Sequence, residues 1–263
     1  MKTALITGGS SGFGLEFARQ LAAQKFNLIL VARNVEQLQA AADELHQQFG
    51  VATDILAGDL SDETFVADVV RKIHTTKDLA VLINDAGFGL HESLLDDSPE
   101  ATAKQRAAFR VMAQNVLELS AAAAQTMMAQ KTKGQIINIA SANAWIYTGN
   151  YSALKRWVVS YTEGLAIELA GSGVTTTAVC PGWSHTNFHK NVNLPEPNVP
   201  EWMFVKPAAV VSEGLKASRK GQIICIPTAR WKFMLWVAEH FPRTIARSFT
   251  RRYMAGRHDN AQQ

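Results

Sequence analysis

Thr7-Gly8-Gly9-Ser10-Ser11-Gly12-Phe13-Gly14 lies between an apolar run at residues 3–7 and an amphipathic stretch at 14–24. This context predicts a strand, a glycine-rich turn and a helix. Glycines let a backbone approach a pyrophosphate closely, and a helix N-terminus offers free N–H groups and a partial positive charge. An ordinary glycine-rich turn is the alternative, but the context favours a nucleotide site. The residues predicted to bind phosphates are Gly8, Ser10, Ser11, Gly12, Phe13 and Gly14.

Apolar runs and helical patterns alternate as far as residue 227. Strands are predicted at 3–7, 27–32, 52–57, 79–84, 134–140, 174–180 and 222–227. Helices are predicted at 14–24, 35–49, 62–75, 100–130 and 152–171. Most apolar runs are continuous, which is typical of strands buried on both faces. The order predicts an α/β fold of Rossmann type, with a three-layer, doubly wound, mostly parallel sheet. Without repeats or a flexible linker, residues 1–263 are predicted to form a single domain.

The composition bounds the class of protein. Hydrophobic residues make up 47% and charged residues 19% of the chain, enough apolar material for a core. No uncharged apolar run is long enough to cross a bilayer, and no signal peptide precedes the first strand, so we expect a cytoplasmic protein. Cys180 and Cys225 lie in apolar runs and are predicted to be buried, reduced thiols. No spacing suggests a metal site.

Two segments depart from the alternation. Residues 185–206 contain Pro195, Pro197 and Pro200, which exclude a regular helix. A loop of this length in a compact domain predicts a substrate lid, with a disordered segment as the alternative. Residues 230–263 carry seven basic and two acidic residues, whereas the rest of the chain holds 19 basic and 21 acidic ones. A slightly acidic body argues against nucleic-acid binding.

The basic tail has a helical period. Four apolar positions recur every four residues, and three arginines follow two positions behind them, on the opposite helix face. These residues are Phe241, Ile245, Phe249, Tyr253, Arg243, Arg247 and Arg251. A C-terminal helical extension is therefore predicted over 230–257. It either packs on its own domain or a partner subunit, which amphipathic helices usually do, or makes peripheral contact with an anionic membrane.

The end of the second predicted strand bears on the cofactor. An acidic residue here usually binds the adenosine ribose hydroxyls in NAD-binding folds, but this chain has Arg33. Its planar, permanently charged guanidinium suits a 2′-phosphate, so NADP(H) is predicted over NAD(H), with a solvated arginine as the alternative. Asp59 and Leu60, after the third strand, are placed for the adenine. Asp59 or Ser61 could instead cap the helix at 62–75.

Tyr151 and Lys155 lie four residues apart at the start of a predicted helix, on one face. A tyrosine with an ordinary pKa of about 10 is a poor base at neutral pH. A neighbouring ammonium stabilises the phenolate and is expected to lower that pKa. The pair follows an apolar strand that ends near Ser141, and strand ends are where ligands bind in α/β folds.

With these residues in order, the chain resembles the single-domain branch of the short-chain dehydrogenase/reductase family, and is most similar to bacterial ketoacyl and hydroxysteroid-type reductases. The residues that carry the resemblance are Thr7-Gly8-x-x-x-Gly12-x-Gly14, Asp59, Asn84-Asp85-Ala86-Gly87, Asn115, Ser141, Tyr151-x-x-x-Lys155 and Pro181-Gly182-x-x-x-Thr186.

The resemblance implies a role for each motif. Tyr151 would be the acid or base at the substrate oxygen, Lys155 would lower its pKa and bind the nicotinamide ribose, and Ser141 would hydrogen-bond the substrate. Asn115 would hold a water in a proton relay. Asn84, Ala86 and Gly87 would shape the floor under the adenosine ribose. Pro181, Gly182 and Thr186 would contact the nicotinamide end or the phosphates.

Two departures from the family pattern stand out. Asp85 replaces the second asparagine of Asn-Asn-Ala-Gly and adds a carboxylate near the cofactor. Ser141 and Tyr151 are also closer in sequence than the family usually shows, which reshapes the substrate pocket.

Aromatic and apolar residues predict a lipophilic ketone, aldehyde or alcohol as substrate, unless they only pack the core. The predicted pocket residues are Phe88, His91, Trp145, Tyr147, Trp183 and Phe188. The predicted function is NADP(H)-dependent interconversion of a carbonyl and an alcohol, in a homodimer or homotetramer. An NADPH-binding regulator without turnover is the alternative.

Overall fold

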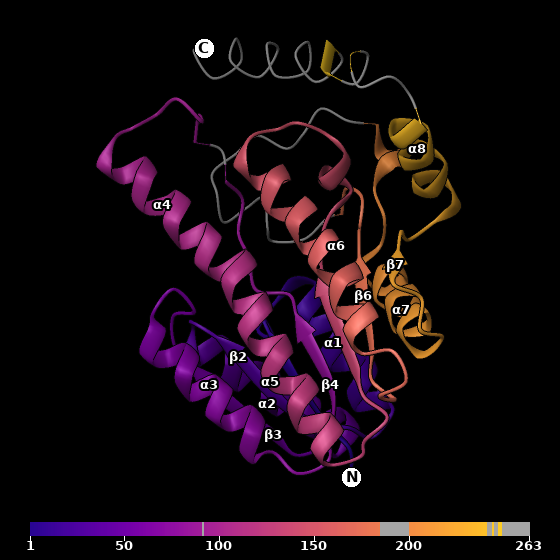
Figure 1. Cartoon of the computed structure of the whole chain (residues 1–263). Coiled ribbons are helices and arrows are strands. Elements are labelled where there is room, and N and C mark those ends of the chain that lie inside the picture. Colours follow the sequence, from indigo (N-terminus) through magenta and orange to yellow (C-terminus); the bar gives the residue numbers. More distant parts are fainter. Residues whose placement is uncertain (91, 185–199, 241–243, 245–246, 249–263) are drawn as a thin grey trace.

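The computed structural model describes residues 1–90, 92–184, 200–240, 244 and 247–248. Seven strands form one sheet in the order β3-β2-β1-β4-β5-β6-β7, and every neighbouring pair is parallel (Figure 1). The strands are β1 (Thr3–Thr7), β2 (Asn27–Ala32), β3 (Thr53–Ala57), β4 (Leu79–Asn84), β5 (Gln135–Ile139), β6 (Thr175–Val179) and β7 (Ile224–Cys225). The predicted α/β class is confirmed. The strand order reverses at β1 and β4, where ligands bind in open sheets of this kind.

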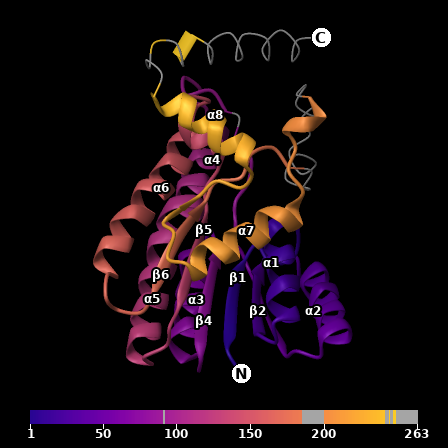
Figure 2. The same ribbon diagram turned by 90° about the vertical axis from the view of Figure 1, so that its right-hand side faces the viewer.

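Helices cover both faces of the sheet (Figure 2). Against one face pack α1 (Gly12–Ala23), α2 (Val35–Phe49) and α7 (Pro207–Arg219). Against the other pack α3 (Glu63–Thr75), α5 (Asn115–Ala129) and α6 (Asn150–Glu168). The remaining helices are α4 (Pro99–Phe109), a π-helix (Arg110–Gln114), 3₁₀ turns (Ala142–Trp145 and Glu201–Met203) and α8 (Ala229–His240). α8 lies beyond the carboxyl ends of the strands.

The continuous apolar strands fold as their sequence predicts because alternate side chains enter two separate cores. In β1, Ala4 and Ile6 join the core under α1 and α2, whereas Leu5 joins the core under α3 and α5. All three are fully buried. Burial of a large apolar side chain contributes about 1.5–3 kcal/mol, so neither layer is dispensable.

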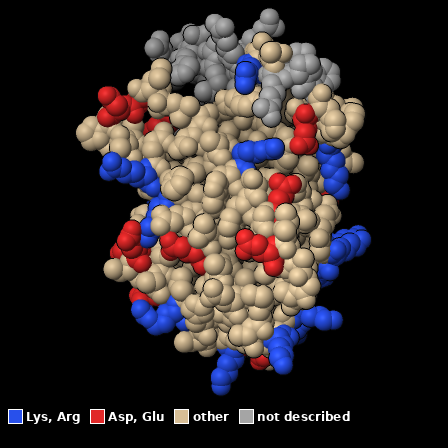
Figure 3. Space-filling view, in the orientation of Figure 1, with Lys and Arg blue, Asp and Glu red and all other residues tan. Residues whose placement is uncertain are grey.

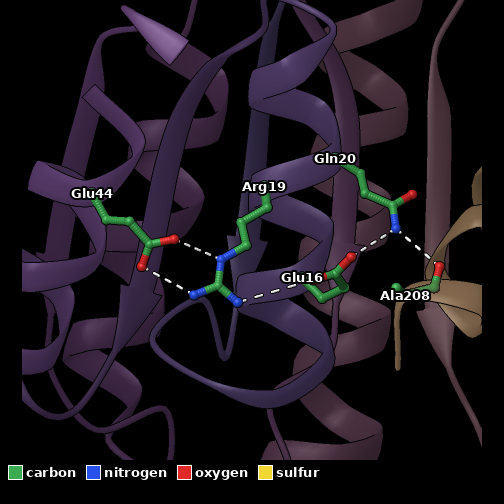
Figure 4. A network of polar contacts seen from close by, with 5 residues as sticks. All are labelled: Glu16, Arg19, Gln20, Glu44 and Ala208. Atoms are coloured by element: carbon green, nitrogen blue, oxygen red, sulfur yellow. Dashed lines mark hydrogen bonds and ion pairs between the residues drawn. The ribbon is translucent and has the colours of Figure 1, made fainter. Parts of the chain in front are cut away.

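Polar contacts fix α1, the helix that follows the glycine turn, to its neighbours (Figure 4). Arg19 Nε lies 2.7 Å from Glu44 Oε1 of α2, and hydrogen bonding to Glu44 raises the pKa of Arg19. On the other side, Gln20 Nε2 donates to Glu16 and to the Ala208 carbonyl of α7. These contacts join the middle of α1 to α2 and α7.

The structure differs from the sequence prediction in three elements. The helix predicted at 100–130 is interrupted by the π-helix Arg110–Gln114. β7 is shorter than the predicted 222–227 at both ends, and at its C-terminal end Pro227 has no N–H to extend the ladder. α7 adds to the predicted helices, with Pro207 at its first position, where a missing N–H costs nothing.

Other expectations concern burial and charge. Cys180 and Cys225 are buried free thiols, as predicted. Across the residues that the structure describes, no helix combines the length and apolarity needed to cross a membrane. On the face in Figure 3, acidic and basic side chains are interspersed. Most of the predicted lid (185–199) and most of the tail beyond residue 240 lie outside the described residues.

Candidate active site

The glycine turn brings two backbone segments into close contact. Gly8 and Gly12 adopt positive φ angles of 73° and 56°, which glycine tolerates without strain. A Cβ on Gly14 would lie 2.3 Å from the Gly8 carbonyl oxygen, so no other residue fits there. Ser11 precedes α1 without a side-chain cap. The N–H of Gly14 in this first turn donates to Asp85, and the uncapped N–H groups of Gly12 and Phe13 are suited to a phosphate.

Thr7 joins the turn to the segment after β4. Its Oγ1 accepts hydrogen bonds from the N–H groups of Asp85 and Ala86, each at 3.1 Å. Asp85 Oδ2 in turn accepts the N–H of Gly14 at 2.8 Å. The segments that follow β1 and β4, on either side of the switch point, are therefore connected through Asp85. Sequence reasoning did not identify this contact.

The Asn84 side chain is occupied inside the protein. It is 5% exposed, and its Nδ2 donates to Ser120 Oγ and Asn138 Oδ1, while Asn138 donates to Thr162. This amide therefore joins β4, β5, α5 and α6, and it does not point to a ligand. Gly87 is exposed next to Met112, whose Sδ would lie 3.2 Å from a Cβ at that position.

The predicted adenosine end lies at the carboxyl ends of β2 and β3. Arg33 is exposed directly after β2. Asp59 is also exposed, and its Oδ1 accepts the N–H of Ser61 at 2.8 Å. Neither Asp59 nor Ser61 caps α3: the N-cap is Asp62, whose side chain accepts the N–H of Thr64. That alternative role for Asp59 is wrong.

Ser141, Tyr151 and Lys155 come together at the carboxyl end of β5. The Ser141 hydroxyl is hydrogen-bonded to the Tyr151 phenol, so the short sequence spacing still brings the two side chains into contact. Lys155 Nζ lies 5.7 Å from the centre of the Tyr151 ring and donates to the Ile139 carbonyl at 2.8 Å. The lysine is 5% exposed.

Burial dominates the charge states of this pair. Burial raises the pKa of Tyr151, and the negative charge of Asp85 raises it further. The hydrogen bond from Ser141 acts in the opposite direction and lowers it. Burial also lowers the pKa of Lys155 to about 8, against the attraction of Asp85. The expected lowering of the Tyr151 pKa is therefore absent from the protein alone, because burial destabilises the phenolate by more than the hydrogen bond from Ser141 stabilises it.

Asn115 lies where the π-helix meets α5, and π-turns are frequent at functional sites. Its Nδ2 donates to the Leu60 carbonyl at 2.6 Å. Its Oδ1 is buried and has no hydrogen-bond partner among the described residues. The amide thus connects the predicted adenosine end to the core beside α6, while its oxygen stays available for a further donor.

The described residues of the predicted substrate pocket differ in how far they are buried. Phe88, Trp145 and Trp183 are half-buried and pack on the cores, whereas Tyr147 is 47% exposed. The Trp145 ring also faces the Arg156 guanidinium at 5.5 Å. His91, Thr186 and Phe188 lie outside the described residues.

α8 closes one side of this region, through Trp231. A Cβ on Gly182 would lie 1.9 Å from the Trp231 ring, so the glycine lets the indole pack on the Pro181-Gly182 turn. Trp231 Nε1 donates to the Met203 carbonyl at 3.1 Å. Sequence reasoning did not identify this contact. Gly182 was the one feature of the sequence that could have indicated it.

Comparison with known proteins bears on this arrangement. The family model described as short chain dehydrogenase matches residues 2–197. A very-long-chain 3-oxoacyl-CoA reductase from Anas platyrhynchos is 27% identical over 243 residues, which cover 91% of this chain and 75% of that protein.

Two solved structures are similar over most of their length. A short-chain dehydrogenase from Sphingobium yanoikuyae in complex with NADPH has a TM-score of 0.80 at 28% identity, covering 89% of this chain and 92% of that one. A bulky-bulky ketone specific alcohol dehydrogenase from Comamonas testosteroni has a TM-score of 0.76 at 25% identity, covering 91% and 92%. The matched residues 2–197 include the glycine turn and the Ser141–Tyr151–Lys155 group. The chain belongs to the short-chain dehydrogenase family of oxidoreductases.

Proposed function

We propose that the protein is an NADP(H)-dependent oxidoreductase that interconverts a ketone or aldehyde and an alcohol, and that it reduces a lipophilic carbonyl with Tyr151 as the acid. The contact between the Tyr151 phenol and the Ser141 hydroxyl, with Lys155 5.7 Å from the ring, carries the proposal. This group lies at the carboxyl edge of the sheet, on the far side of the switch point from Arg33.

The residues present fit a nicotinamide cofactor. The Gly8–Gly14 contact leaves no room for a side chain at the turn, and the start of α1 offers N–H groups to a pyrophosphate. Exposed Arg33 would bind a 2′-phosphate, with Asp59 and Leu60 near the adenine. The NADPH complex of the Sphingobium yanoikuyae relative supports this preference. When bound, the cofactor supplies the hydride for reduction.

The protein's own residues handle the proton. Because burial raises the pKa of Tyr151, the phenol is protonated at neutral pH and is ready to donate to a carbonyl oxygen. Ser141 contacts the phenol by a hydrogen bond in the protein alone, and its hydroxyl would donate to the same carbonyl oxygen once the substrate is bound. Lys155, with its pKa lowered to about 8, exchanges protons near physiological pH. The buried Asn115 Oδ1 is suited to hold a relay water. A protonated tyrosine favours reduction as the working direction.

A lipophilic substrate is supported by the aromatic residues around Ser141. Trp145 and Trp183 present half-buried indoles, and the buried Trp231 of α8 belongs to the core on which they pack. The similar protein from Comamonas testosteroni is specific for bulky ketones, and the one from Anas platyrhynchos is a reductase of very-long-chain 3-oxoacyl-CoA. We infer a bulky, largely apolar carbonyl compound for this chain.

Three further expectations remain proposals: a cytoplasmic location, a homodimer or homotetramer, and peripheral membrane contact through the C-terminal extension. The described start of that extension packs on its own domain, since Trp231 and Leu235 are buried, whereas Phe233 and Trp236 are exposed. A regulator that binds NADPH without turnover is the competing function. The contact of Ser141 with Tyr151 beside a buried lysine disfavours it, because a sensor has no need of such a group.

A spectrophotometric assay tests the proposal. NADPH consumption is followed with a panel of bulky aliphatic, aromatic and cyclic ketones, and NADH is compared on the best substrate. We expect turnover with at least one apolar ketone and a clear preference for NADPH. Binding of NADPH without consumption on any ketone, aldehyde or alcohol would favour the regulator, and equal efficiency with both cofactors would exclude the NADP(H) preference.

A further inference from the structure

Asp85 is a half-buried carboxylate at a position where the family pattern has a neutral amide. Its backbone N–H is fixed by Thr7 Oγ1 at 3.1 Å, and its Oδ2 accepts the Gly14 N–H at 2.8 Å. A Cβ placed on Gly8 or Gly14 would lie 3.1 or 3.0 Å from this oxygen. The carboxylate therefore lies directly against the turn that is proposed to hold the pyrophosphate.

The same carboxylate acts on the catalytic pair. Lys155 of α6 is the charged side chain whose field lowers the pKa of Asp85, and Asp85 raises the pKa of both Lys155 and Tyr151. From the other elements, α1 contributes the Gly14 N–H to the carboxylate, whereas Thr7 of β1 accepts only the backbone N–H of Asp85. Burial outweighs these contacts and raises the pKa of Asp85 to about 7. The group therefore changes charge in the physiological range.

We propose that Asp85 is a positioning residue that joins the glycine turn to the Tyr151–Lys155 pair and makes cofactor binding depend on its own protonation. The inference rests on the proposed function, because it assumes a nicotinamide dinucleotide on the turn. Both forms of the carboxyl group keep an oxygen that accepts from Gly14. Only the ionised form places a negative charge beneath the anionic pyrophosphate and holds Lys155 in its charged form.

Two consequences follow from the charge. Cofactor affinity falls as the pH rises through the range in which Asp85 ionises, because the new charge repels the pyrophosphate. Removing the charge lowers the pKa of Tyr151, so alcohol oxidation, which needs the phenolate, begins at lower pH. A residue that only supported the turn would change neither pH profile.

The test compares the wild type with Asp85→Asn, which keeps the acceptor oxygen and removes the charge. Calorimetric titrations with NADH and with NADPH are made from pH 6 to 8.5. NADH is the decisive probe because it lacks the 2′-phosphate, which itself titrates near pH 6. Asp68→Asn on α3 is the matched control: it removes the same charge from an exposed residue that pairs with Arg71.

We expect NADH affinity in the wild type and in Asp68→Asn to fall roughly tenfold over this range, and affinity in Asp85→Asn to fall clearly less, because only the titration of Lys155 remains. The pH profile for alcohol oxidation by Asp85→Asn should also shift to lower pH. If Asp85→Asn does not fold, Asp85→Ser, which introduces a smaller neutral residue, replaces it, and the same results are expected. A flat wild-type profile, or equal slopes in the wild type and the neutral variants, would overturn the inference while NADPH-dependent turnover stood. Failure of the wild type to bind either cofactor at any pH would overturn the proposed function instead.

Discussion

Single residues at this site owe their chemistry to burial more than to sequence neighbours. The four-residue spacing predicted that Tyr151 and Lys155 would share one volume, and the family resemblance added Ser141; the structure brings the three together. The charge states could not be predicted in this way, because they depend on how deeply each group is buried. Asn84 shows the same limit: its partners, Ser120 and Asn138, are distant in sequence and appear only when β4 and β5 pair.

Arg33 is the residue on which the cofactor preference depends. Because its guanidinium is exposed at the end of β2, Arg33→Ala should remove a charge-assisted contact with the 2′-phosphate and leave the fold intact. A contact of this kind contributes about 1.5–3 kcal/mol, so we expect the KM for NADPH to rise about 10- to 100-fold and the KM for NADH to stay unchanged. Steady-state kinetics with both cofactors measure the effect.

Arg71→Ala, which removes an exposed arginine from α3, is the matched control and should leave both KM values as they are. Unaltered NADPH kinetics in Arg33→Ala would show that this arginine is only a solvated residue at the end of a strand.

Among the elements, helices with clear caps and apolar periods were predictable, and breaks within helices were not. α2 begins after Asn34, whose side chain accepts the Gln37 N–H, and ends at Gly50 in the left-handed conformation. The π-helix Arg110–Gln114 inserts one extra residue into a turn, which a period averaged over 100–130 does not reveal. The packing of α8 was equally hidden, because it depends on a glycine far away in the sequence.

α8 is expected to contribute to stability through Trp231. Its indole is 7% exposed, packs on Gly182 and donates to the Met203 carbonyl. Trp231→Ala should therefore lower the free energy of unfolding by about 3–5 kcal/mol, as for other buried aromatic residues. Trp236→Ala removes a 57% exposed indole from the same helix and should change it by less than about 1 kcal/mol. Chemical denaturation followed by circular dichroism measures both. Equal losses in the two variants would show that α8 is not docked through Trp231.

The overall fold follows from one repeated pattern, the burial on both faces of β1, β2, β4, β5 and β6. That pattern predicted a parallel sheet between two helical layers, but apolar runs do not specify which strands are neighbours. The order β3-β2-β1-β4-β5-β6-β7 depends on how the crossover helices pack, and it places the turn after β1 beside Asp85 after β4. The site is therefore a property of the assembled sheet.

Stability of the cofactor-free protein should depend on pH through Asp85. Its pKa is raised from about 3.9 in the unfolded chain to about 7, so the folded protein binds the proton more tightly. The stability associated with this proton is complete below pH 4 and is lost as the pH rises to 7. Asp85→Asn has no such loss. The free energy of unfolding of Asp85→Asn should therefore rise relative to that of the wild type by about 1–3 kcal/mol between pH 5 and pH 8.

Thermal unfolding across this range measures the difference, at about 2–4 °C per kcal/mol for a domain of this size. Asp68→Asn, an exposed residue, should run parallel to the wild type at every pH. A constant offset between Asp85→Asn and the wild type would mean that the carboxyl is ionised throughout.

The turnover of Tyr151→Phe tests proton donation by Tyr151 most directly. The change removes one hydroxyl, and Tyr161→Phe removes the same group from the same helix, where the phenol contacts the Leu117 carbonyl at 3.3 Å. With the best ketone and saturating NADPH, Tyr151→Phe should lose about 10²–10⁴-fold in kcat and still bind NADPH, whereas Tyr161→Phe should keep wild-type turnover. Near-normal turnover by Tyr151→Phe would contradict the assignment of the acid.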